Sequence, residues 1–172
     1  MTRIEKADIS PTMIKLLLTY GREYKLTHLP REVPRGPLGE CFKNCADVAI
    51  LSDMFNEDGS PALLYSKPYR YVEGIALELK QGKNPKMVYH AWLTDGKRAI
   101  DPTYYQNAWD GYKVKWDKYR YIGVEIPTEF IDDFLEQTEM YGILDRHKQC
   151  PALYKKLVAH LRDGQYSTYS SS

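Results

Sequence analysis

A histidine and an aspartate flank a predicted tight turn in the stretch VYHAWLTDGKRAIDPT, residues 88–103. Asp95-Gly96 between two alternating runs predicts a two-residue β-hairpin loop, because a type I′ turn needs positive φ at both central positions. With that loop, His90 lies directly opposite Asp101 on one face of the hairpin. Opposed Cβ atoms are about 4.5–5.5 Å apart in such a ladder, so an imidazole–carboxylate hydrogen bond is expected.

This pair has two interpretations. In the catalytic one, the carboxylate orients the histidine and makes it more basic, as in two members of a catalytic triad. In the other, His90 and Asp101 form a structural ion pair, which also perturbs titration without any catalysis. Trp92 is expected beside them on the same face. The opposite face supplies a core side, formed by Ala91, Leu93 and Ile100.

A candidate nucleophile lies in PRGPLGECFKNC, residues 34–45. Cys41 follows a turn-rich approach and is placed where a helix should begin. Unpaired N–H groups and the positive end of the helix dipole favour a thiolate there. A neighbouring His90 would complete a thiolate–imidazolium pair. Cys45 lies one turn deeper on the apolar stripe, where packing is its expected role.

Three other interpretations of the two helix cysteines remain open. A zinc site could use Cys41, Cys45 and His90, but a fourth ligand at a recognisable spacing is missing. A redox couple would need a disulfide within one helical turn, which is geometrically awkward. The cysteines could also carry no chemistry at all. A nucleophile at Cys41 needs only residues already placed, so we expect neither a metal nor a cofactor.

Composition narrows the class of protein. The chain has 172 residues, of which 43% are hydrophobic and 27% charged, as in a globular domain. A net charge of +1 provides no basic field, so nucleic acid is not an expected partner. No apolar run approaches the roughly 18 residues of a membrane span, and the start lacks a signal-peptide core. Three cysteines cannot complete a disulfide framework, so a cytoplasmic location is expected.

The residues that carry chemistry must be positioned by a mixed set of elements. A helix is expected from Ser10-Pro11 to Gly21 and another from residue 40 or 41 to about 55, followed by strand-like segments. The strands are predicted at residues 69–79, 87–94, 97–101 and 119–126. Two helices follow, over residues 128–142 and 151–164. The order predicts one α+β domain over residues 1–164 and a mobile polar tail over 165–172.

A cysteine at a helix start, then a histidine in a strand, then an aspartate ending the next strand resembles the transglutaminase-like branch of papain-like cysteine enzymes. The segments GECFKNC, YVEGIAL, YHAWLTDGKRAIDPTY and YIGVEI also resemble a family of small, mostly uncharacterised bacterial and phage proteins. That family carries C-x-x-N, Y-V-E-G, H-A-W and D-P-T blocks in this order. The resemblance covers residues 36–126 and implies a thiol-bearing helix packed on an antiparallel β-sheet, flanked by N- and C-terminal helices.

The resemblance also implies roles for individual residues. Cys41 matches the nucleophile, His90 the general base and Asp101 the orienting acid. Asn44 and Glu73 match polar positions of the small-protein family, with substrate contact or support as their expected roles. Asn44 lies one turn after Cys41, where it could touch substrate or hold a loop.

The predicted activity is cysteine-dependent acyl transfer on a peptide or other amide or acyl substrate. Peptidase or amide hydrolase, deamidase and transglutaminase chemistry all use this trio of residues, and fold does not choose among them. Specificity is expected from the aromatic segment at residues 104–116, which begins with Tyr104 and Tyr105, and from residues 67–71 at the entry to the first strand. Trp92 is expected to bind substrate or to support the site. The alternative is a catalytically silent phage or bacterial protein that binds and inhibits a host protein. If the chain is phage-encoded, its compartment would be the host cytoplasm.

Overall fold

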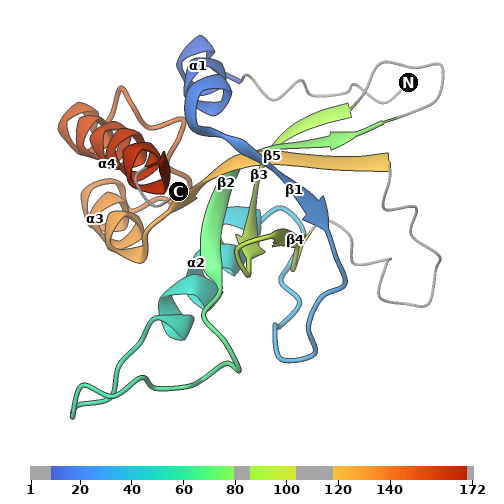
Figure 1. The fold of residues 1–172 in the computed structure, drawn as a ribbon, viewed down its shortest axis with the longest axis vertical. Coiled ribbons are helices and arrows are strands. Elements are labelled where there is room, and N and C mark those ends of the chain that lie inside the picture. The colour runs from blue at the N-terminus through green and yellow to red at the C-terminus, as the bar shows by residue number, and fades with distance from the viewer. Residues whose placement is uncertain (1–8, 80–85, 104–117, 170–172) are drawn as a thin grey trace.

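The computed structural model describes residues 9–79, 86–103 and 118–169, with backbone alone for 165–169. In chain order the elements are α1 (Pro11–Tyr20), β1 (Arg22–Leu26), α2 (Cys41–Ser52), β2 (Arg70–Glu78), β3 (Lys86–Thr94), β4 (Arg98–Ile100), β5 (Tyr119–Ile126), α3 (Thr128–Thr138) and α4 (Pro151–Tyr169). This arrangement confirms the predicted α+β class (Figure 1). None of the helices in these ranges is long and apolar enough to cross a bilayer.

The five strands close into a small barrel in the order β1-β4-β3-β2-β5. β2 pairs antiparallel with both β3 and β5 over most of its length. β1 closes the ring, because it pairs parallel with β4 and antiparallel with β5. In Figure 1, α3 and α4 lie side by side, on the same side of the strands as α1.

Alternation along the strands separates two apolar clusters. The barrel interior holds Tyr24, Leu26, Val72, Ala76, Trp92, Ala99 and Tyr121. The outer cluster packs the strands against the helices, and it contains Ala91, Leu93 and Ile100 as predicted. The prediction for the two faces of the hairpin is therefore confirmed: Trp92 and Ala99 face the barrel interior, and the other three face the helices.

Strand β1 was not predicted from the sequence. Its five residues follow Gly21 directly, and only Tyr24 and Leu26 are buried. Such a short alternation gives a weak local signal. The segment is a strand because β4 and β5 supply its hydrogen-bond partners, and these partners lie far away in the chain.

Three helix ends differ from the prediction. α2 ends at Ser52 rather than near residue 55. α3 ends at Thr138 rather than Gly142, because Glu139 adopts a left-handed conformation with φ 54° and its N–H caps Leu135 O. α4 continues through Gly164 to Tyr169, because one glycine costs a helix only about 1 kcal/mol. The predicted polar tail therefore begins inside a helix, and its residues 170–172 lie outside the described residues.

Candidate active site

The β3–β4 turn is longer than predicted. The observed pairs are Leu93 with Ile100 and Thr94 with Ala99, whereas a two-residue loop would pair Thr94 with Lys97. Every partner is therefore displaced by two residues. The predicted left-handed conformation of the turn glycine is present, since Gly96 has a φ of 103°.

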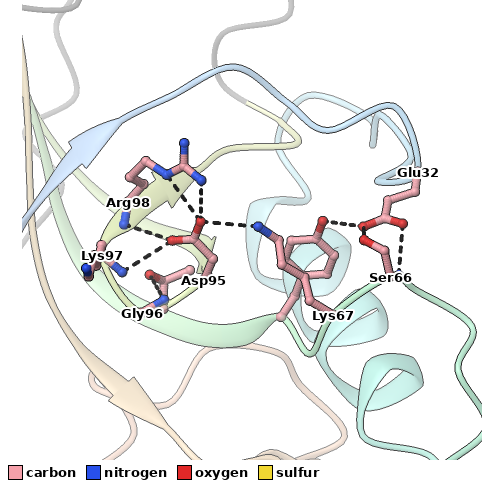
Figure 2. Close-up of polar contacts among 9 residues, drawn as sticks. Glu32, Ser66, Lys67, Asp95, Gly96, Lys97 and Arg98 are labelled. Atoms are coloured by element: carbon pink, nitrogen blue, oxygen red, sulfur yellow. Dashed lines mark hydrogen bonds and ion pairs between the residues drawn. The ribbon is translucent and has the colours of Figure 1, made fainter.

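The side chain of Asp95 explains the longer turn (Figure 2). Its Oδ1 accepts the backbone N–H groups of Lys97 at 3.3 Å and Arg98 at 3.2 Å. Aspartate commonly replaces a backbone acceptor in this way, so the turn is stabilised without a type I′ ladder. The Arg98 guanidinium and Lys67 Nζ also contact the carboxylate. Burial raises the pKa of Asp95, but the Arg98 guanidinium, the two backbone N–H groups and Lys67 together hold it well below its usual value.

The displacement leaves the predicted pair on one face. A shift of one residue would turn every side chain to the other face of the sheet, whereas a shift of two preserves the faces. His90 Nε2 lies 2.7 Å from Asp101 Oδ2, and the two residues are only 1% and 3% exposed. The predicted hydrogen bond is therefore confirmed, although the predicted register is wrong.

Two further donors hold the Asp101 carboxylate, and the sequence reasoning found neither. The Thr103 N–H donates to Oδ1 at 2.9 Å, and the Tyr121 hydroxyl donates to Oδ2 at 2.7 Å. The D-P-T motif contained a signal for Thr103, because aspartate side chains often accept the N–H two residues on. No local signal points to Tyr121, because it reaches Asp101 from a distant strand.

Cys41 begins α2, and α2 packs against β3. Cys41 is partly exposed, and the side chain of Glu40 does not cap the helix. Burial lowers the pKa of His90, but the charge and hydrogen bond of Asp101, then those of Cys41, raise it to about 10. Imidazolium is therefore the favoured form at neutral pH. Nε2 of His90 is hydrogen-bonded to Asp101, so Nδ1 is the ring nitrogen that can exchange a proton with the Cys41 thiol.

The other cysteines are packed inside the protein. Cys45 is fully buried, which raises the pKa of its thiol well above the usual value, so its predicted packing role is confirmed. Cys150 is also buried. Within the described ranges, no three His, Cys, Asp or Glu side chains are grouped to hold a metal ion, so the zinc interpretation gains no support.

Asn44 forms hydrogen bonds to two loops, the one that precedes Cys41 and the one that follows Asp101. Its Nδ2 donates to Pro37 O at 3.0 Å and to Thr103 Oγ1 at 2.7 Å. The Gly36 N–H adds a bond to Pro102 O at 3.0 Å. Of the two roles predicted for Asn44, the structure thus supports loop holding, which ties the segment before Cys41 to the segment after Asp101.

Glu73 supports the fold from the outer face of the barrel. Its fully buried carboxylate accepts the hydroxyls of Tyr71 at 2.6 Å and Tyr89 at 2.5 Å. It also accepts the backbone N–H groups of Ile143 and Leu144, at 2.8 and 2.9 Å. Burial raises the pKa of Glu73, and these donors oppose the shift. The carboxylate therefore anchors the α3–α4 connection to β2.

Trp92 lies in the barrel interior, where it orients its neighbours. Its ring stacks beside His90 at 6.4 Å and meets the ring of Tyr121 edge-on at 5.0 Å. Because it is fully buried, support of the imidazole is the role that the geometry gives it. Tyr104, Tyr105 and the rest of the aromatic segment at 104–116 lie outside the described residues.

The described residues define an α+β protein in which β3 and the end of β4 supply His90 and Asp101, and the start of α2 supplies Cys41. Comparison with family models, curated proteins and solved structures gives no match for this chain. A thiol, an imidazole and a buried carboxylate are one set of groups that can support nucleophilic catalysis.

Proposed function

We propose that the protein is a cysteine-dependent acyl-transfer enzyme with a fold of the transglutaminase-like or papain-like kind. The observation that carries this proposal is the buried His90–Asp101 pair together with Cys41. Cys41 is partly exposed, and its side chain interacts with His90 by a hydrogen bond and by charge. An ion pair with a purely structural role does not need a thiol next to its histidine. Here Cys41, at the N-terminus of α2, has a side-chain hydrogen bond with His90.

In the first half-reaction, the Cys41 thiolate attacks the carbonyl carbon of an amide or ester. A C–S bond forms, the C–N or C–O bond breaks, and His90 gives its proton to the leaving group. The backbone N–H groups at the start of α2 are suited to stabilise the oxyanion. In the second half-reaction, water or an amine attacks the thioester. His90 takes the proton of that nucleophile, and the C–S bond breaks to restore the thiolate.

Alkylation by iodoacetamide tests whether Cys41 is activated. An ordinary thiol has a pKa near 8.5, so its alkylation rate falls about tenfold per pH unit below that value. In contrast, we expect the alkylation of Cys41 to stay fast down to about pH 6 and to become ordinary in His90→Ala. Peptide mapping separates Cys41 from the two buried cysteines. Slow alkylation with an ordinary pH profile would favour the silent binding protein.

A second experiment tests acyl transfer itself. Wild-type protein mixed with p-nitrophenyl acetate should release a burst of p-nitrophenol and carry an acetyl group on Cys41, detected by mass spectrometry. Cys41→Ala should abolish the burst. Cys45→Ala is the matched control, because it removes a buried thiol on the same helix and should retain the burst. A burst that persists in Cys41→Ala would refute the proposal.

A further inference from the structure

We propose that Tyr121 is a positioning residue of this site, which holds the Asp101 carboxylate and, through it, the imidazole of His90. The inference rests on the proposed function, because a positioned imidazole matters to catalysis only if the thiol reacts. Tyr121 lies on β5, whereas Asp101 follows β4, and these two strands are not neighbours in the barrel. The hydroxyl therefore reaches Asp101 across the barrel interior.

Both hydrogen bonds fall on the same oxygen. Asp101 Oδ2 lies 2.7 Å from His90 Nε2 and 2.7 Å from the Tyr121 hydroxyl, while Oδ1 takes the Thr103 N–H. An ionised carboxylate only accepts hydrogen bonds, so the phenol proton must point to Oδ2. Tyr121 is fully buried and Asp101 is 3% exposed, so bulk water does not substitute for the phenol.

This arrangement has a consequence for the proton on His90. Among the described residues, Asp101 and Cys41 have charges that act on the imidazole, and the aromatic rings of Trp92 and Tyr121 lie beside it. The positive end of the Tyr121 O–H dipole lies against Oδ2 and weakens the attraction of that oxygen for the imidazolium. Without the hydroxyl, His90 should hold its proton more tightly, which would slow both half-reactions.

An NMR titration of the His90 ring tests this role. Tyr121→Phe should raise the pKa of His90 by about 0.5 or more, and the same change in an Asp101→Asn background should give no shift. Tyr24→Phe is the matched control, because it removes another hydroxyl of the barrel interior that binds Arg22 and Glu125 instead. This control should leave the titration unchanged.

Two results would overturn the inference. One is a His90 titration unchanged in Tyr121→Phe, and the other is an equal shift with and without the Asp101 carboxylate, as expected of a ring that only packs. If Tyr121→Phe fails to fold, Tyr121→Met also lacks the donor and adapts to the space, and it should give the same shift. The titration needs no substrate. An unreactive Cys41 would therefore defeat the proposed function while the role of Tyr121 was still decided.

Discussion

His90 Nε2 and Asp101 Oδ2 lie 2.7 Å apart although the two residues are not opposed in the β3–β4 ladder. The ladder ends at Ile100, and the carboxylate of Asp101 is held by Thr103 and Tyr121 rather than by strand pairing. The pair therefore depends on sharing one face of the barrel.

Replacing Asp101 by asparagine should weaken both the fold and the reactivity of the thiol. Loss of one partner of a buried ion pair costs about 3–5 kcal/mol in the free energy of unfolding, measured by urea titration. Alkylation of Cys41 at pH 6 should slow about 100-fold, because the imidazolium loses its counter-charge. Asp132→Asn, on an exposed face of α3, is the control and should change neither quantity. An Asp101→Asn variant as stable and as reactive as wild type would contradict the assigned role of the carboxylate.

The ion pair should make stability fall as the pH rises. The pKa of His90 is raised to about 10, against about 6.5 in an unfolded chain. Its stabilisation is therefore fully present below about pH 6.5 and is lost as the pH rises through the folded value. Urea unfolding from pH 6 to about pH 10 should show a loss in wild type relative to Asp101→Asn, in which the other titrating groups are the same. Parallel curves would show that the pair contributes no such linkage.

Gly123→Ala should destabilise the barrel by about 1–3 kcal/mol through overpacking. A Cβ at this position would lie 2.6 Å from Trp92 Cη2 and 2.6 Å from Glu73 O. The added Cβ would displace the ring of Trp92, which stacks beside His90. The near-ultraviolet circular dichroism of Trp92 should therefore change as well. Gly164→Ala is the matched control on α4, where a Cβ meets nothing within 4 Å, and it should stabilise by up to about 1 kcal/mol. Equal unfolding midpoints for the two variants would contradict the close approach at Gly123.

Glu73→Gln should separate support of the fold from support of the chemistry. The neutral amide loses charge-assisted bonds to Tyr71, Tyr89 and the α3–α4 connection, at a cost of about 2 kcal/mol in unfolding free energy. The pH profile of Cys41 alkylation should stay as in wild type, because Glu73 lies on the outer face. Glu129→Gln, on the exposed side of α3, is the control for stability. An altered alkylation profile in Glu73→Gln would assign the carboxylate to the site instead.

The elements of the fold that depend on short-range residue patterns could be predicted from the sequence. Strand β5 was predicted with its observed ends, and the start of α2 at Cys41 was also correct, because both follow from short-range alternation and turn residues. Strand β1 was missed, since its hydrogen-bond partners come from β4 and β5. The hairpin register was also missed, since the Asp95 side chain competes with the expected backbone turn.

For the site, the sequence by itself determined the chemistry: the residue types of Cys41, His90 and Asp101, and the shared face of the last two. Side chains alternate between faces with a period of two residues, so the predicted face was correct although the predicted register was wrong by two residues. Only the tertiary structure decided what surrounds the pair. Barrel closure brings Tyr121 to Asp101, and burial with charge sets the protonation of His90. These contacts join strands that are distant in the chain, so no local pattern of residues encodes them.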